Sequence, residues 1–317
     1  DSTSASQNTA VGSFAGTNLT TGGLNVAVGQ NALFTATTGT NNVAVGQAAL
    51  DALTTASNNT AVGKDALGAN TTGAYNTAVG TDALLANTTG EDNVAVGRGL
   101  YTNTTGDKNT AVGRSALYSN TTADNNTAVG HSALFANTTG TNNVAVGYAS
   151  ADAQTTANNT TAIGYQALSA NTGDNNTAVG KDALLSHTSG IYNTAVGSQA
   201  LDANTTANNN TAMGYAALGA NTTGQYNTAV GASALDAVTT SSFNTGIGYS
   251  AGGAVTTGAG NTMLGYETGM AITTQDGNTF LGQAAGNDAT SANNTMVGYL
   301  SGQYITSGAK NTILGTY

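Results

Sequence analysis

The pentad Asn59-Thr60-Ala61-Val62-Gly63 decides the fold, because the chain repeats it from one end to the other. The first copy is residues 8–12 and the last is residues 311–315, with nineteen copies in 317 residues. Successive closing glycines are 17 residues apart fifteen times and 16 residues apart three times. A fixed period of this length is typical of stacked repeat units, each too small to bury a core alone. The sequence therefore predicts a solenoid.

The pentad itself predicts a strand that ends at a sharp corner. We number the repeat from its asparagine as position 1, which makes the closing glycine position 5. The pentad is short, often β-branched and bounded by turn residues. Glycine at position 5 predicts a positive φ or a close backbone approach, and no 3.6-residue apolar stripe supports a helix. We expect an all-β chain, a parallel β-solenoid (β-roll) of about eighteen 17-residue turns, on the order of 85 Å long at ~4.8 Å per turn.

The domain organisation follows from the repeat. Residues 1–7 are an N-terminal lead, and residues 8–317 are one β-solenoid domain whose sub-region 244–317 carries larger apolar residues. Alternate strand residues share a face, and position 4 is always apolar, so positions 2 and 4 are expected to line the core. Position 3 then points outward. It becomes Met263, Phe280, Met296 and Ile313 near the C-terminus, which predicts a second copy covering that surface.

Two other positions predict amide ladders. Position 1 is asparagine in eighteen of nineteen copies, and these amides are expected to hydrogen-bond from turn to turn, to cap their own turns, or to do both. Position 12 is an amide through the middle of the chain and apolar at both ends, which indicates partial burial. Position 9 compensates for the volume at position 12, as close packing of one core requires. Glycine replaces leucine at position 9 where position 12 is usually large, at Gly16, Gly252, Gly269, Gly286 and Gly302.

Composition excludes several classes of partner. The net charge is −10, and the cations are scattered along the chain as Lys64, Arg98, Lys108, Arg114, Lys181 and Lys310. They form no basic stripe for nucleic acid or for an anionic membrane. No apolar run reaches the ~20 residues of a membrane span, and there is no cysteine. The high content of Asn, Thr and Gly favours an extracellular surface fibre. Because the sequence starts at Asp1, we expect a processed form or an excerpt.

No motif carries chemistry. His131 and His187 have no phased partners, and the acidic residues recur too irregularly for a calcium array. Gly252-Gly253 lacks the strand-loop-helix context of a phosphate loop. The sequence predicts no catalytic, cofactor-binding or metal-binding residue, no cofactor and no enzymatic activity.

Several asparagines match the acceptor pattern for N-glycosylation. The burial expected at position 12 favours a structural role for most of them, and Thr71 and Thr72 are candidates for O-linked sugar or solvated turns. The matching sites are Asn18, Asn70, Asn87, Asn103, Asn120, Asn137, Asn159, Asn204 and Asn221.

The pentads at 25–29 and 143–147 are similar to the repeats of trimeric autotransporter adhesin heads. Later copies, such as residues 278–286, resemble repeats of bacteriophage tail fibres and bacterial surface fibres. The resemblance implies a left-handed β-roll, three chains side by side as a homotrimer, and a role in attachment or as a stiff spacer. The adhesin-head repeat is shorter, so the extra residues are expected to form a third side or a loop.

We therefore expect a structural or adhesive extracellular fibre segment, with copies of itself and a cell-surface or glycan receptor as partners. One alternative is a subunit of an end-to-end stacked filament. Another is an ice- or glycan-binding solenoid. An ice-binding face needs threonine on alternate strand residues, whereas Thr71 and Thr72 are adjacent and would point to opposite sides.

Overall fold

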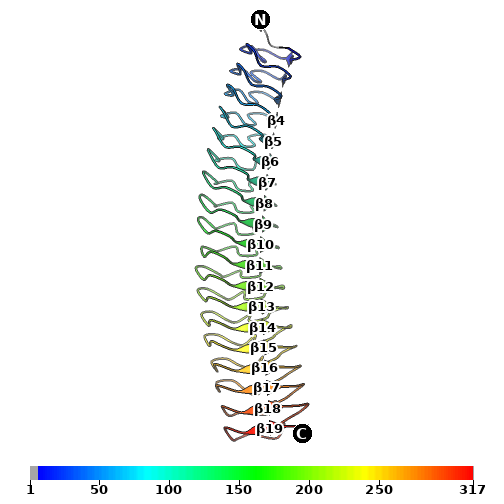
Figure 1. Cartoon of the computed structure of the whole chain (residues 1–317), viewed down its shortest axis with the longest axis vertical. Helices are drawn as coiled ribbons and strands as arrows, with labels where there is room; N and C mark the ends of the chain where they lie inside the picture. Colours follow the sequence, from blue (N-terminus) through cyan, green and yellow to red (C-terminus); the bar gives the residue numbers. More distant parts are fainter. Residues whose placement is uncertain (1–5, 317) are drawn as a thin grey trace. The chain divides into compact units, whose positions relative to one another are not determined.

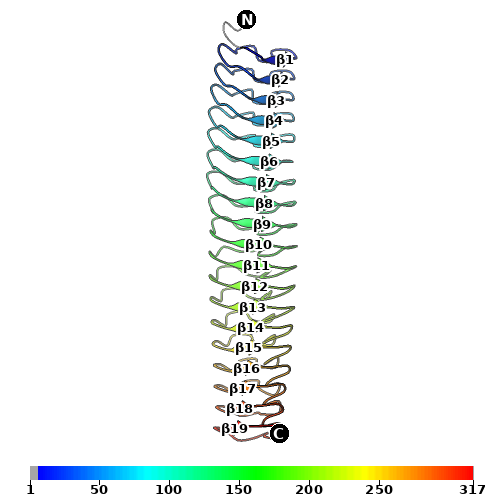
Figure 2. The same cartoon turned by 45° about the vertical axis from the view of Figure 1, so that its right-hand side comes forward.

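A computed structural model describes residues 6–316 of the chain. These residues form short strands joined by turns and no helix. The chain divides into two compact units between Asn159 and Thr160. In each unit successive turns stack so that every strand lies beside the strand of the next turn (Figure 1, Figure 2). The predicted parallel β-solenoid is confirmed.

The described part of the first unit, residues 6–159, holds nine strands, and consecutive strands pair in parallel and in register. They are β1 (Thr9–Val11), β2 (Val26–Val28), β3 (Val43–Val45), β4 (Thr60–Val62), β5 (Thr77–Val79), β6 (Val94–Val96), β7 (Thr110–Val112), β8 (Thr127–Val129) and β9 (Val144–Val146).

The described part of the second unit holds ten strands with the same parallel pairing. They are β10 (Thr161–Ile163), β11 (Thr177–Val179), β12 (Thr194–Val196), β13 (Thr211–Met213), β14 (Thr228–Val230), β15 (Thr245–Ile247), β16 (Thr262–Leu264), β17 (Thr279–Leu281), β18 (Thr295–Val297) and β19 (Thr312–Leu314).

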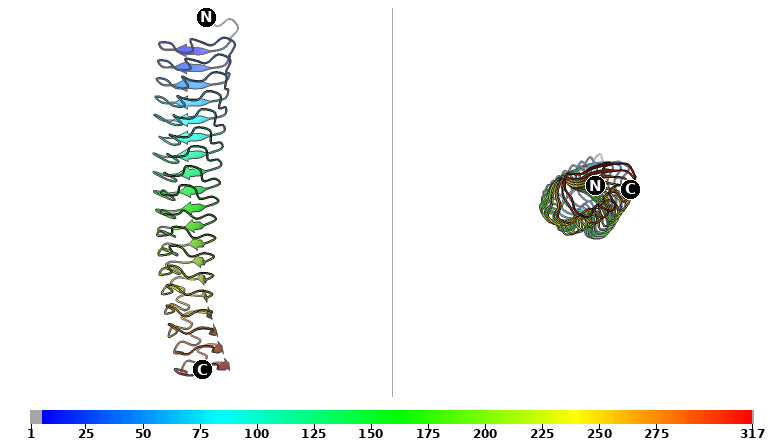
Figure 3. Two further views of the ribbon diagram at one scale, coloured as in Figure 1. Left: turned by 90° about the vertical axis from the view of Figure 1, so that its left-hand side faces the viewer. Right: turned by 90° about the horizontal axis from the view of Figure 1, so that it is seen from below.

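The 16-residue repeats do not disturb this pairing. Val94 lies opposite Thr110, Thr161 opposite Thr177, and Thr279 opposite Thr295. The missing residue is therefore absorbed in a connecting segment, and the strands keep their columns. Figure 3 shows the strands of each unit along one side of its stack of turns.

The corner glycine is required for both of the expected reasons. Gly80 has a φ of +136°, and a Cβ atom placed on it would lie 2.3 Å from the carbonyl oxygen of Gly97 in the next turn. The backbone thus turns in a conformation that L side chains rarely adopt, against a neighbour that leaves no room for a methyl group. Other corners use residues that the sequence did not mark. Asp65, Leu67 and Tyr75 have φ values of 55°, 51° and 60°.

The strand faces are the reverse of those expected. Ala61, at position 3, is fully buried, whereas Thr60 and Val62, at positions 2 and 4, are partly or largely exposed. The same alternation recurs from β2 to β18. The core of each turn is therefore built from positions 3, 8, 9 and 12 and the asparagine of position 1, and it admits only a small residue at most copies of position 3.

The larger residues at position 3 also point into the core. Met263, Phe280 and Met296 are fully buried within one chain, and Ile313 in β19 is half-buried. Glycine at position 9 makes the room: a Cβ atom on Gly286 would lie 2.6 Å from the Phe280 ring, and one on Gly302 would lie 2.3 Å from the Met296 sulfur. The prediction that these side chains need a second copy to cover them is wrong, because the core of their own chain already does so.

Candidate functional site

The asparagines of position 1 form a ladder through the interior of each unit. The Asn59 side-chain oxygen accepts a hydrogen bond from the Asn76 backbone N–H at 3.0 Å, and the Asn59 amide donates to the Gly73 carbonyl at 3.0 Å. The Asn59 amide also donates to the Asn42 side chain at 3.3 Å. The predicted ladder is confirmed, since one side chain joins neighbouring turns; the amide also closes its own turn, through the Gly73 carbonyl and not through a local Asx bond.

A second amide ladder at position 12 confirms the predicted burial there. The side-chain amides of Asn87, Asn103, Asn120 and Asn137 each donate to the side-chain oxygen of the previous member, over 2.8–3.0 Å. All four and Asn70 are fully buried. These five acceptor-pattern asparagines, together with the buried Asn204 and Asn221, are therefore inside the folded chain, where no sugar can be attached.

His187 occupies the same position in the second unit. It is fully buried, and its Nε2 atom lies 2.8 Å from the Gly190 carbonyl oxygen. Burial lowers the pKa of the imidazole, because a charged ring would lose its hydration, while the hydrogen bond to Gly190 acts in the opposite direction. His131 lies on the surface instead, stacked on Tyr148 with ring centroids 5.5 Å apart. Neither histidine carries a metal-ligand set: residues 6–316 contain no group of three or more His, Cys, Asp or Glu side chains able to hold a metal.

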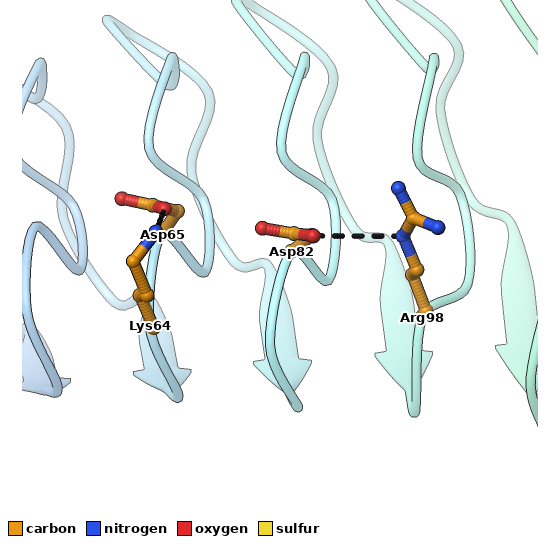
Figure 4. Close-up of polar contacts among 4 residues, drawn as sticks. All are labelled: Lys64, Asp65, Asp82 and Arg98. Carbon is orange, nitrogen blue, oxygen red and sulfur yellow. Dashed lines mark hydrogen bonds and ion pairs between the residues drawn. The ribbon is translucent and has the colours of Figure 1, made fainter.

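A few of the charged groups pair on the surface. Lys64 pairs with Asp65, and the Arg98 Nε atom lies 3.5 Å from an Asp82 carboxylate oxygen in the neighbouring turn (Figure 4). The Arg98 guanidinium also lies 4.4 Å from the centroid of the Tyr101 ring. Burial raises the pKa of the Asp51 carboxyl, and the charge of Asp65 raises it further. These groups are spread along the turns and converge on no common point.

Aromatic side chains form short rows on the surface of each unit. In the first unit, Tyr101 and Tyr118 stack with centroids 4.9 Å apart, and Phe135 continues the row 5.4 Å from Tyr118. In the second unit, Tyr226 stacks on Phe243 at 5.2 Å. Each ring covers a face of its neighbour, so a binding partner would mainly contact the edges of the rings.

In each unit the strands expose a further surface, which we call the outer strand face: the side chains at positions 2 and 4 of β1–β9 in the first unit and of β10–β19 in the second. Position 2 is threonine in fifteen strands and valine in the other four, and position 4 is Val, Ile, Leu or Met. Sequence reasoning missed this surface because it assigned these residues to the core. The sequence held one signal that could have corrected this assignment: the large Phe280 at position 3 occurs in the same turn as the small Gly286 at position 9, as expected if both face one core.

Comparison with known proteins adds no further assignment: no protein-family model matches the chain, and no curated protein matches it. In the described residues no helix is long and apolar enough to cross a membrane. Assignment of a function therefore rests on the solenoid and its surfaces.

Proposed function

We propose that the chain is a structural segment of an extracellular fibre, such as a surface adhesin or a phage tail fibre, and not an enzyme. The observation that carries this proposal is the bonding between turns. From turn to turn, Thr60 N–H donates to Asn76 at 2.8 Å, Leu67 N–H to Ala83 at 3.0 Å and Thr71 N–H to Thr88 at 2.9 Å. These bonds lie on different sides of the coil, and the two amide ladders add further hydrogen bonds between turns.

This arrangement makes each unit resistant to bending. To bend a stack of turns, the hydrogen bonds on one side must lengthen, and their strength falls steeply with distance and misalignment. The interior amides have no water to replace a lost partner, so breaking them is costly. A repeat of this kind suits a stiff spacer that holds a binding element away from its anchor.

Self-association is part of the proposal, including the side-by-side homotrimer and the left-handed coil that the resemblance implies. Because Met263 and Phe280 fill their own core, the contact surface has to come from other side chains. The best candidates are exposed aromatic residues, since such residues are enriched at protein interfaces. Tyr215, Tyr226 and Phe243 are 58%, 52% and 64% exposed. A cell-surface or glycan receptor is the second expected partner.

Mass measurement by light scattering, together with electron microscopy of the full chain, tests this proposal. We expect particles of one size with a mass of three chains. Replacing Tyr226 and Phe243 together by serine should lower the mass, whereas Thr206→Ser should not. A monomer at all concentrations would remove the homotrimer. If electron microscopy shows particles as flexible as an unfolded chain, the proposed role as a stiff spacer is contradicted.

A further inference from the structure

We propose that the outer strand face binds ice. The first observation is its composition. With two side chains in each of nineteen strands, none of the 38 is charged or aromatic. The chain carries a net charge of −10, and these 38 side chains contribute nothing to it. In the first unit the face consists of threonine and valine alone, two residues of nearly the same shape.

The second observation is that the threonine hydroxyls of this face are free. Among the described residues, no side-chain hydrogen bond joins a position 2 hydroxyl to another protein group, as at Thr194 and Thr211. The threonines of position 13 differ: Thr54 donates to the Thr71 carbonyl at 3.1 Å, and Thr71 to Thr88 at 3.0 Å. Position 13 therefore uses its hydroxyls to join turns, whereas position 2 holds its hydroxyls available to an external partner.

The third observation is regularity in two dimensions. Consecutive strands pair in strict register, as at Thr194 opposite Thr211 and Val196 opposite Met213. Paired strands lie ~4.8 Å apart, and side chains two residues apart on one strand lie roughly 6.6 Å apart. β-Branched side chains are stiff at χ1. Within each unit, the side chains of positions 2 and 4 are thus held in two in-register columns before any ligand arrives, which lowers the entropic cost of binding.

An uncharged lattice of water fits this surface better than other occupants do. A face of alternate threonines would carry two columns of hydroxyls, whereas this face carries one at position 2 and apolar side chains at position 4. The position 2 hydroxyls can hydrogen-bond to lattice water, and the methyl groups of position 4 can fill the spaces between. The strand spacing is close to the shortest repeat of hexagonal ice. A glycan site would need aromatic platforms and varied polar groups, which this face lacks. Contact with an identical face would bury a column of hydroxyls, and each one left unpaired would cost about 1–3 kcal/mol. Against the surface of an ice crystal, each hydroxyl can find a water molecule as its hydrogen-bond partner.

Ice-affinity partitioning and inhibition of ice recrystallisation, measured on the full chain, test this proposal. The test variant is Thr194→Tyr with Thr211→Tyr, which places two bulky rings on the face at positions where tyrosine suits a strand. The control is Thr206→Tyr with Thr223→Tyr, which changes exposed threonines of position 14 in the same two turns. Circular dichroism establishes that both variants fold.

We expect the wild-type chain to enter growing ice and to inhibit recrystallisation. The face variant should need a concentration at least about tenfold higher, equivalent to ~1.4 kcal/mol of binding, while the control keeps the wild-type activity. The proposal is overturned if the wild-type chain is excluded from ice, or if both variants lose activity equally. It is also overturned if the face variant dissociates an oligomer and leaves the behaviour in ice unchanged, because the face would then be a contact between copies.

Discussion

Two groups of turns fill the same backbone in opposite ways. In the first unit, the turns that contain Asn70 to Asn137 place alanine at position 3, leucine at position 9 and a hydrogen-bonded amide at position 12. In the second unit, the turns that follow Val238 place an apolar residue at position 12 (Val255, Ile272, Ala289 or Ile305), glycine at position 9 and, from Met263 on, a large apolar residue at position 3.

The comparison shows that a turn fixes the volume of its interior and not its chemistry. Leucine at position 9 and phenylalanine at position 3 compete for the same space, as the clash of a Cβ atom on Gly286 with the Phe280 ring shows. The amides of Asn87 to Asn137 at position 12 bond to an adjacent turn, and Asn221 bonds within its own turn to the Gly224 carbonyl, whereas an apolar side chain needs no partner. Four changes test this account.

The largest effect is expected from Phe280→Ala. The substitution empties the space that Gly286 leaves beside the ring, and such a truncation costs about 3–5 kcal/mol of unfolding free energy. Adding Gly286→Leu should recover part of the loss, because it recreates the alanine and leucine pair of the first unit. Urea unfolding of the two variants measures this. If Phe280→Ala costs no more unfolding free energy than the surface change Tyr266→Ala, then positions 3 and 9 do not exchange volume as we infer.

An intermediate effect is expected from Asn103→Val in the ladder. The change removes the donor that lies 2.9 Å from the Asn87 side-chain oxygen, and leaving a buried polar group unpaired costs about 1–3 kcal/mol. The reciprocal change, Val255→Asn, should also destabilise, since it buries an amide without a ladder. Hydrogen exchange read turn by turn locates both losses. A stabilised Asn103→Val variant would show that the amide ladder is dispensable.

A smaller effect that depends on pH is expected at His187. Its pKa in the folded chain is below the ordinary value of 6.5, so the unfolded chain takes up the proton first as the pH falls. The stability from the neutral ring is complete above that value and is lost as the pH falls through the folded pKa. Thermal unfolding from about pH 7.5 to about pH 5 should show wild type losing stability relative to His187→Asn.

Acidic residues of the second unit act in the opposite direction. Burial raises the pKa values of Asp202 and Asp236, so their contribution to stability increases as the pH falls. Both proteins carry these residues, and the difference between wild type and His187→Asn therefore isolates the histidine. Parallel pH curves for the two proteins would contradict a buried neutral imidazole.

The smallest effect is expected from Asp82→Asn, which removes the ion pair with Arg98. The two side chains are 26% and 43% exposed, so water screens their attraction, and the unfolding free energy should change by less than about 1 kcal/mol. Asp92→Asn, in the same turn, serves as the control. A loss as large as that of Asn103→Val would mean that surface pairs and interior amides are equally important.

The sequence predicted the repeat, the strands, the glycine corners and the burial of position 12, because each depends on residue types that recur in phase. It did not predict which strand face is buried. Alternation groups positions 2 and 4 against position 3 but does not say which set points inward, and the apolar Val62 favoured the wrong choice. Nor could it predict the positive φ of Leu67, since leucine rarely adopts that conformation. The candidate ice-binding face was missed for the first of these reasons.

The stack of corner glycines has a consequence for how such a gene changes. Since a Cβ atom on Gly80 would meet the backbone of the next turn, no substitution in an adjacent turn can make room for it. Duplication or deletion of a whole seventeen-codon unit, in contrast, leaves every remaining corner seated on an identical neighbour. Unequal recombination between repeats would therefore lengthen or shorten the protein in whole turns, and selection can adjust length without redesigning the coil.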